Sequence, residues 1–286
     1  MLKKKSESVR VLQETIEDLF DLDPARLPPE ASSVIGELRD KLSSGEVRAA
    51  EPGPHGWVVN SWVKKGILLG FHVGQIEEYS VGEHFRFFDK STLPPRRLEI
   101  YDGVRLVPGG SSIRDGAFVG RGVVCMPPMF INVGAYVDAG TMIDSHALIG
   151  SCAQIGRHVH VSAGAQIGGV LEPIGAMPVI IEDDVLVGGN CGIYEGIRIR
   201  KGAVLASGTI LTRSTPVYDL VNEMELRADG DNPLSIPRGA VVVPGSRPAK
   251  GDFASSKGLQ IYAPVIVKYR DPGTDAAVAL ESALRR

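Results

Sequence analysis

The sequence lacks any long hydrophobic run, because no stretch of its 286 residues approaches the roughly 18 consecutive apolar residues that a membrane span requires. Its first residues, MLKKK, lead into a segment that is charged throughout, so we expect no secretion signal. It also lacks a dominant charge: 31 basic and 34 acidic residues are mixed along the chain and leave a formal net charge of −3. Such a balance creates no broad field for nucleic acid or for an anionic membrane, so neither is predicted as a partner.

Cysteines are few, and their number and spacing argue against two kinds of structural cross-link. The chain has three, Cys125, Cys152 and Cys191, an odd number without a Cys-x-x-Cys pair. This pattern fits a reducing cytoplasm better than a disulfide framework or a structural zinc site. The sequence also contains no GxGxxG between a strand and a helix and no GxxxxGK[S/T], so neither a dinucleotide site nor a P-loop is predicted.

What the sequence does contain is a sixfold repeat of aliphatic residues. Six matches neither the helical period nor the strand period. The count is unbroken over residues 113–167 and resumes at Ile181, 14 residues after Ile167, which indicates about eight inserted residues in one repeat. The repeat positions are Ile113, Val119, Cys125, Ile131, Val137, Ile143, Ile149, Ile155, Val161, Ile167, Ile181, Val187, Ile193, Ile199, Leu205, Leu211 and Val217.

A second set of mostly small or β-branched residues lies four positions after the first. Both sets must face inward, so each repeat is a short strand and a tight turn that buries its apolar side only by stacking on the next repeat. Three repeats make a triangular coil of roughly 18 residues, which predicts a mainly β fold: a hexapeptide-repeat parallel β-helix of roughly five to six coils. The second set is Ala117, Val123, Ala135, Thr141, Ala147, Ala153, Val159, Ala165, Val185, Ala203, Thr209 and Thr215.

The region before the repeat follows other patterns. Residues 1–108 contain two segments with helical apolar spacing, 8–20 and 31–45, and a short strand that leads into a third helix over 56–71. We therefore expect an N-terminal α/β domain over 1–108, followed by the β-helix over 109–220.

The region after the repeat reads as a small C-terminal cap over 221–286. After Val217 the repeat is expected to stop in a polar loop. Segments 239–251 and 259–270 then have the character of strands, and 274–286 that of a terminal helix. A solenoid needs such a cap, because its last coil otherwise exposes unpaired strand edges.

Side chains within the repeat give few independent signs of chemistry. Asp138 and Asp144 both directly follow a repeat position, where small or acidic residues shape the turns. Cys152 belongs to neither set and has no histidine and carboxylate at a matching spacing, so it is a poor nucleophile candidate. The separation between His146 and His158 puts them on different sides of a coil, and we expect no metal site.

The central sequence resembles the tetrahydrodipicolinate N-succinyltransferase family. The resemblance is carried by FINVGAYVDAGTMIDSHALIGSCAQIGRHVHVSAGAQIGGVLEPIGAMPVIIEDD and extends to SWVKKGILLGF, FRFFDK, VRLVPGGSSIRDGAFV and YAPVIVKYR, so it covers most of the chain. It implies left-handed β-helices in a homotrimer with active sites between adjacent subunits. It also implies a cytoplasmic enzyme without a metal, which moves the succinyl group of the co-substrate succinyl-CoA to the amine of opened, hydrated tetrahydrodipicolinate, on the succinylase route to diaminopimelate and lysine.

The resemblance also assigns site residues. In the family an arginine and an aspartate contact the dicarboxylate substrate, and they match Arg105 in VRLVP and Asp144 in GTMID. Asp144 is also implied as the catalytic group that accepts or orients the amine proton. Many members read GARSEVVEG where this chain reads GGNCGIYEG, so Asn190 replaces an arginine and Gly192 replaces a glutamate proposed as the catalytic partner of the aspartate. Glu195, which matches the second glutamate, is the candidate for that role; a backbone and water arrangement, or a different substrate, stays open.

Coenzyme A needs cations for its phosphates and a groove with backbone groups for its pantetheine arm. Ala206, Ser207 and Gly208 lie at a turn in the last coils, and Lys250 and Lys257 lie on a loop beyond them. We expect these five residues to bind the acyl-CoA.

Two alternatives to succinyl transfer stay open. One is an N-acetyltransferase acting on the same or a related amino dicarboxylate, which would not need a cation near the acyl end. The other is a non-catalytic hexapeptide scaffold, which Gly192 in place of a glutamate suggests.

Overall fold

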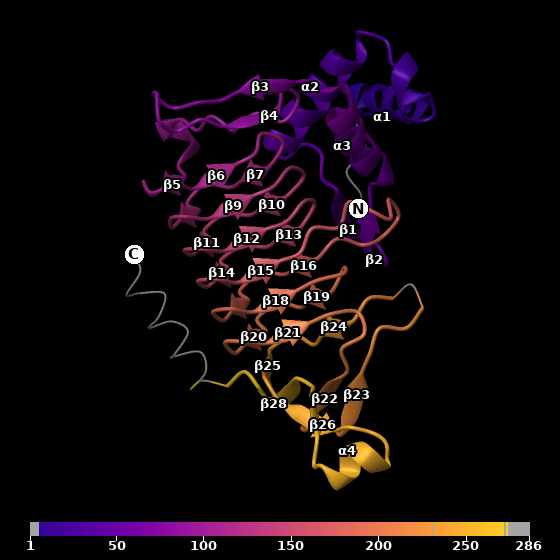
Figure 1. The fold of residues 1–286 in the computed structure, drawn as a ribbon, viewed down its shortest axis with the longest axis vertical. Coiled ribbons are helices and arrows are strands. Elements are labelled where there is room, and N and C mark those ends of the chain that lie inside the picture. The colour runs from indigo at the N-terminus through magenta and orange to yellow at the C-terminus, as the bar shows by residue number, and fades with distance from the viewer. Residues whose placement is uncertain (1–5, 231, 272, 274–286) are drawn as a thin grey trace.

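Three parallel sheets wind into one solenoid, as the sixfold repeat predicts. The computed structural model describes residues 6–230, 232–271 and 273, and in its solenoid every third strand stacks on the same sheet (Figure 1). Tyr136 pairs with Gln154, 18 residues later, so one coil is three repeats long. Each strand contributes one outward and one inward residue, because successive side chains of a strand point to opposite faces.

The three sheets are numbered here in the order in which the chain first enters them. Sheet 1 contains β5 (Arg105–Leu106), β8 (Val124–Cys125), β11 (Met142–Ile143), β14 (His160–Val161), β17 (Leu186–Val187), β20 (Val204–Leu205) and β25 (Ala240–Val243). Sheet 2 contains β6 (Ser112–Ile113), β9 (Phe130–Ile131), β12 (Leu148–Ile149), β15 (Gln166–Ile167), β18 (Gly192–Ile193) and β21 (Ile210–Leu211). Sheet 3 contains β7 (Phe118–Val119), β10 (Tyr136–Val137), β13 (Gln154–Ile155), β16 (Ile180–Ile181), β19 (Arg198–Ile199) and β24 (Ser235–Ile236).

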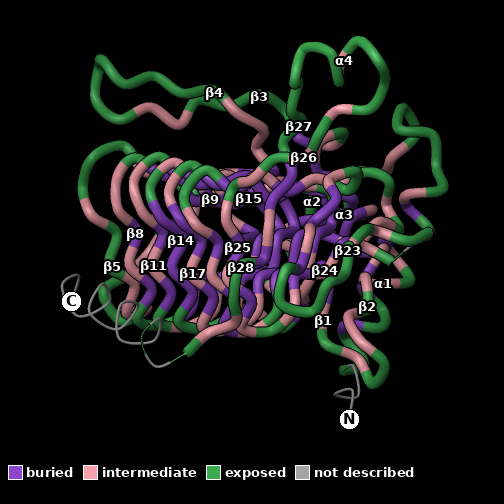
Figure 2. Tube along the Cα trace, turned by 90° about the horizontal axis from the view of Figure 1, so that it is seen from below, coloured by how far each residue is buried: buried purple, intermediate pink, exposed green. Residues whose placement is uncertain are grey.

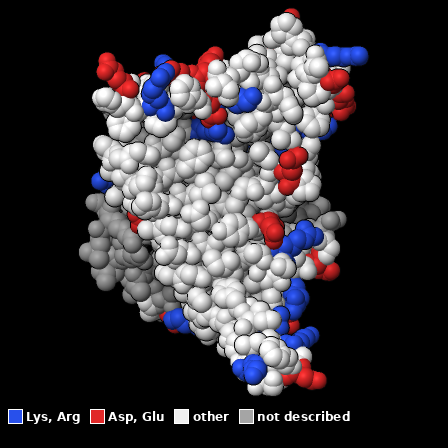
Figure 3. Space-filling model, viewed as in Figure 1, with Lys and Arg blue, Asp and Glu red and all other residues white. Residues whose placement is uncertain are grey.

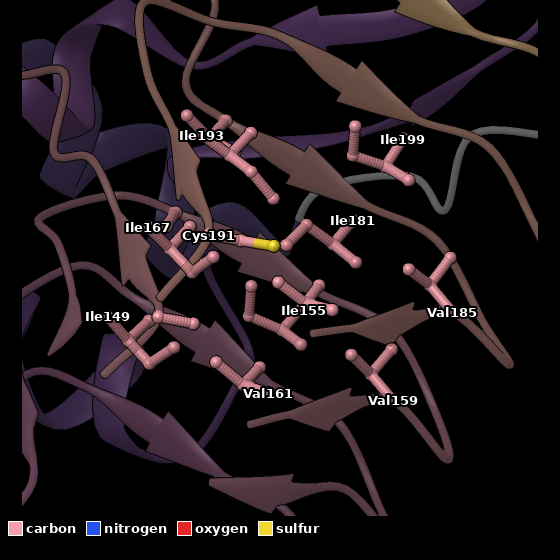
Figure 4. Packing of buried hydrophobic residues seen from close by; sticks show 14 of the residues in the cluster. Ile149, Ile155, Val159, Val161, Ile167, Ile181, Val185, Cys191, Ile193 and Ile199 are labelled. Carbon is pink, nitrogen blue, oxygen red and sulfur yellow. The ribbon is translucent and has the colours of Figure 1, made fainter. Parts of the chain in front are cut away.

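The repeat positions form the core of the solenoid, which is a triangular prism with the three sheets as its faces. Those between residues 113 and 217 are at most 5% exposed, and the second set is buried as well, apart from the half-buried Thr215. In Figure 4, Ile149, Ile155 and Val161, which come from the three different sheets, point toward one another in the interior. Burying each such side chain contributes roughly 1.5–3 kcal/mol, and each coil obtains this only by stacking on its neighbours.

The predicted insertion of eight residues is confirmed. Gln154 pairs with Ile180, 26 residues later instead of 18, because residues 168–179 leave the solenoid as a loop between β15 and β16.

A second excursion corrects the expectation that the repeat stops in a polar loop after Val217. Arg198 pairs with Ser235, 37 residues later, so the chain returns to the solenoid and β24 and β25 extend sheets 3 and 1. The excursion itself contains a hairpin of β22 (Val217–Asp219) and β23 (Met224–Leu226). Its length is not a multiple of six, so the count that resumes at Ile181 misses the buried Ile236.

The N-terminal region contains the three predicted helices. They pack into a second apolar cluster, and this region also lies on the outer side of sheet 3 (Figure 1). There the guanidinium of Arg48 stacks 3.6 Å from the centre of the Tyr136 ring, and its Nε donates to Gln154 Oε1 at 2.9 Å. The elements are α1 (Glu7–Phe20), η1 (Pro24–Arg26), α2 (Ala31–Ser43), β1 (Ala50–Gly53), β2 (Gly56–Val59), α3 (Ser61–Val73), β3 (Ile76–Glu78), β4 (Phe88–Lys90) and η2 (Ile100–Asp102).

The C-terminal region closes the lower end of the solenoid. β28 (Val265–Tyr269) pairs antiparallel with β25 and covers the open edge of sheet 1. β26 (Ser246–Pro248), α4 (Asp252–Ser256) and β27 (Gln260–Tyr262) form an arm, residues 246–262, that projects from the body (Figure 2). The helix predicted for 274–286 lies outside the described residues. Among the helices of the described part, none is long and apolar enough to cross a membrane.

Candidate functional site

Asp144 stands at the turn between sheets 1 and 2, directly after β11. Its Oδ1 accepts the backbone N–H of Ser145 at 2.8 Å, so the turn fixes one carboxylate oxygen. The other oxygen, Oδ2, lies 3.9 Å from Nε2 of His160 in the next coil. The Asp144 side chain keeps 22% of its surface exposed, so a substrate can reach it.

Below Asp144 the same turn position carries small residues, which leaves a groove along this edge of the prism. Asp144, Ser162, Gly188 and Ala206 are equivalent in four successive coils, because the N–H of each makes the same bond to the next coil. With strands stacked about 4.8 Å apart, the four positions span roughly 14 Å. The groove has a volume of about 340 Å³ and is walled by the outward side chains of β17 and β20. We call it the edge groove; it extends from Asp144 to Ser207.

The structure brings some of the predicted coenzyme A residues to this groove. Ala206 and Ser207 form its lower end, and Gly208 follows them with a φ of +78° that favours glycine. Lys250 and Lys257 do not line the groove. Both are exposed on the arm, which leaves the body shortly after β25.

Arg105 belongs to sheet 1, whose strands β17 and β20 wall the groove, but it lies at the opposite end of that sheet. β5 pairs with β8 and β8 with β11, so Arg105 lies two coils, about 10 Å, from the strand that ends beside Asp144. Its side chain is exposed. Arg105, Asp144 and the edge groove therefore follow one another along one side of the solenoid.

Glu195 occupies a different edge, the turn between sheets 2 and 3. Its φ is +55°, and its Oε2 accepts the N–H of Arg213 at 2.6 Å. It follows β18, two strands beyond β12 in sheet 2, and it lines a cavity of about 1110 Å³ together with the inserted loop 168–179. Within one chain, Glu195 is therefore not beside Asp144.

Tyr194 gives a physical reason for the glycine at position 192. A Cβ on Gly192 would lie 2.6 Å from Cε2 of Tyr194, and a Cβ on Gly168 would lie 2.8 Å from Cδ1 of the same ring. The tyrosine ring thus lies against two glycines of sheet 2 and its edge, Gly192 in β18 and Gly168 directly after β15. A side chain at position 192 would have to displace it.

Comparison with known proteins identifies the family. Residues 11–73 match the family model described as "Tetrahydrodipicolinate N-succinyltransferase N-terminal", and residues 178–213 match "Hexapeptide repeat of succinyl-transferase". Proteins named 2,3,4,5-tetrahydropyridine-2,6-dicarboxylate N-succinyltransferase are similar over nearly the whole chain. The one from Afipia carboxidovorans is 40% identical, over 97% of this chain and 99% of its own. The one from Aromatoleum aromaticum is 42% identical, over 96% of this chain and 98% of its own. The chain belongs to the tetrahydrodipicolinate N-succinyltransferase family.

In this member of the N-succinyltransferase family, the thiols have the surroundings of structural residues. Cys152 is fully buried and packs with Val133 against the N-terminal helices. Burial raises the pKa of the Cys152 thiol to about 12, and likewise that of Cys125. Because the thiolate is the nucleophile, such thiols are unreactive near neutral pH. Within residues 6–230, 232–271 and 273, no group of three or more His, Cys, Asp or Glu could hold a metal ion.

Sequence reasoning missed His160 as a neighbour of Asp144 in this succinyltransferase fold. The signal was present, because a coil of 18 residues sets His160 against Met142, two positions before Asp144. The same register would also have revealed the small residues below Asp144.

Proposed function

We propose that this chain transfers the succinyl group of succinyl-CoA to the amine of opened, hydrated tetrahydrodipicolinate, a step in diaminopimelate and lysine biosynthesis. The observation that carries the proposal is the order of groups along one side of the solenoid: Arg105 on sheet 1, then Asp144, then the edge groove. A planar guanidinium binds a carboxylate with two parallel hydrogen bonds. The acceptor would thus lie between Arg105 and Asp144, and the donor would reach Asp144 from the other side.

The edge groove suits the arm of the acyl donor. Between its thiol and its phosphates, pantetheine is comparable in length to about four extended residues, or roughly 14 Å. The four equivalent turn positions span the same length. The aliphatic walls of the groove bury the methylenes of pantetheine. Lys250 and Lys257 lie on the protein arm of residues 246–262, which begins beyond the lower end of the groove, where the phosphates would emerge.

The reaction requires one proton acceptor and no covalent enzyme intermediate. The acceptor nitrogen attacks the thioester carbonyl carbon, the carbon–sulfur bond breaks, and coenzyme A leaves as a thiolate. Asp144 takes the proton that the attacking nitrogen must lose and returns it to the leaving sulfur, so an amide and a free thiol result. Three free and buried cysteines agree with this route, and they suit the reducing cytoplasm, where we place the enzyme.

The assembly we propose is a homotrimer with sites shared between subunits. The outward residues of sheet 2 are uncharged, and the middle of the coils in Figure 3 shows few charged side chains. If sheet 2 of each copy faces a threefold axis, the edge with Asp144 abuts the neighbour's edge with Glu195, because these edges flank the same sheet. Glu195 is then two coils, about 10 Å, below Asp144 along the axis and can contact an extended substrate rather than Asp144 itself. Light scattering should give three times the 30.5 kDa chain mass, and a monomer at micromolar concentration would contradict shared sites.

The donor is tested by comparing succinyl-CoA and acetyl-CoA on one preparation. Steady-state thiol release with the dicarboxylate amine should favour succinyl-CoA. A preference of tenfold or more for acetyl-CoA would instead support the acetyltransferase.

The scaffold alternative is tested by the dependence of thiol release on the amine. An enzyme releases coenzyme A faster when the acceptor is present. Release that is independent of the acceptor would favour a hexapeptide scaffold without this activity, and the proposed function would be refuted.

A further inference from the structure

His160 lies next to the proposed proton acceptor but has no role in the site described so far. It is the outward residue of β14, one coil below Met142, and only 8% of its surface is exposed. Its Nε2 faces Asp144 Oδ2 at 3.9 Å, while Oδ1 is held by the turn. The two residues paired with it in the neighbouring strands, Met142 and Leu186, carry no charge, so Asp144 is the acidic group that the adjacent coil brings to this ring.

We infer that His160 is a positioning residue that donates its Nε2–H to Asp144 Oδ2 and aims the carboxylate at the acceptor amine. The inference rests on the proposed function. Hydrogen bonds of catalytic groups are often long before substrate binds, and a small rotation of either side chain closes the present distance to an ordinary one. A carboxylate offers about four acceptor positions, so a bond from His160 can be added to the one that Ser145 makes.

Positioning matters here because Asp144 extends from a turn at the rim of a groove. The printed turn contact is a single hydrogen bond from the Ser145 N–H to Oδ1, and a rotation about Cβ–Cγ that strained this bond would move both oxygens of the carboxylate. A reacting group displaced by 1 Å can lose about a hundredfold in rate. A donor on the neighbouring strand, which is fixed by the parallel pairing of β11 and β14, removes that freedom.

Two substitutions distinguish a donor from a titrating base. The amide nitrogen of glutamine can reach the place of Nε2 and donates there, whereas that of asparagine is too short. We expect His160→Gln to keep kcat within about fivefold and His160→Asn to lower it about a hundredfold, with the KM for acyl-CoA unchanged in both. The matched control is His158→Asn, an exposed turn residue with a φ of +53° that asparagine tolerates; its kcat should match wild type.

The pair is tested further in the Asp144→Asn background. If His160 acts through Asp144, adding His160→Asn there should lower kcat by less than about threefold, because its effect is already lost. If the kcat losses of the two single variants multiply fully in the double variant, the inference is overturned. Equal kcat losses for His160→Gln and His160→Asn would also overturn it, because they would indicate that the histidine itself carries the proton. Circular dichroism melts check that each variant is folded.

Failure of the proposed function would be distinguished from failure of this inference by the wild-type protein. Wild type without acceptor-dependent thiol release refutes the function. The contact is also readable without activity, from the ¹⁵N shifts of the His160 ring: they should change in Asp144→Asn but not in Asp138→Asn. Unchanged shifts in both would overturn the inference.

Discussion

Replacing Asp144 by asparagine separates a catalytic carboxylate from one that only shapes a turn. Asparagine has nearly the same shape, and its carbonyl oxygen can still accept the Ser145 N–H now bound at 2.8 Å. The buried Ile143 and Ala147 on either side keep the coil in place. We therefore expect Asp144→Asn to fold and assemble as wild type, with a change in the free energy of unfolding below about 1 kcal/mol.

The rate should respond quite differently. The variant loses a proton acceptor at the reacting nitrogen, and such a contribution is typically about 10²- to 10⁴-fold, equivalent to about 3 to 5 kcal/mol of the activation barrier. The new amide NH₂ also faces His160 Nε2, where it can no longer accept a donated proton. Steady-state thiol release at saturating succinyl-CoA and amine measures kcat directly, and we expect a decrease of at least about a hundredfold.

Asp138→Asn is the matched control, because Asp138 occupies the same repeat position. Its Oδ1 accepts the Ala139 N–H at 2.7 Å, and its Oδ2 pairs with Arg157 at 3.4 Å. Arg157 is 64% exposed, so losing this pair costs at most about 1 kcal/mol of stability, and kcat should not change. Equal activities for the two variants would mean that the turn alone explains Asp144, and the catalytic assignment would be withdrawn.

Three further predictions follow from the groove, the thiols and the turns. Lys250→Ala together with Lys257→Ala should raise the KM for acyl-CoA with little change in that for the amine; an unchanged KM would remove the arm from the site. Because burial raises the pKa of the Cys152 thiol to about 12, alkylating reagents at pH 8 should label Cys152 only after unfolding, and rapid native labelling seen by mass spectrometry would contradict its burial. Gly188→Ala should destabilise the protein, because the added Cβ would lie 2.6 Å from backbone atoms of the next coil. Gly36→Ala should instead stabilise helix α2 by up to about 1 kcal/mol, because nothing lies within 4 Å of its added Cβ. Thermal melts that rank the two variants otherwise would be inconsistent with this packing.

The solenoid was predictable from sequence because one rule, an aliphatic residue at every sixth position, is repeated and redundant. A single exception such as Cys125 does not hide it, and the offset between Ile167 and Ile181 measures the insertion correctly. The return of the chain at β24 was not predictable in the same way. It follows an excursion of irregular length, and only two repeat-like residues, Ile236 and Val242, mark it.

The candidate site was only partly predictable, because its residues are brought together by stacking rather than by sequence proximity. The family resemblance supplied Arg105, Asp144 and Glu195, but the resemblance carries no edge assignment. The pairing of strands assigns Asp144 to one edge and Glu195 to another. It also sets His160 beside Asp144, which the 18-residue coil length would have indicated once each position was assigned to a side of the prism.

Acidic residues that share a place in the repeat differ in their surroundings according to the edge on which they lie. On the edge between sheets 3 and 1, Asp138 and Glu182 are engaged by Arg157 and Arg198, and charged side chains fill the space between coils. The edge between sheets 2 and 3 is lined by the inserted loop. Among the described coils, it is between sheets 1 and 2 that small residues follow an aspartate over three coils, and this is the groove in which we propose that the pantetheine chain lies. A solenoid repeats its backbone at each coil, and side-chain size at one turn position is therefore enough to determine where such a groove begins, where it ends and which carboxylate stands at its head.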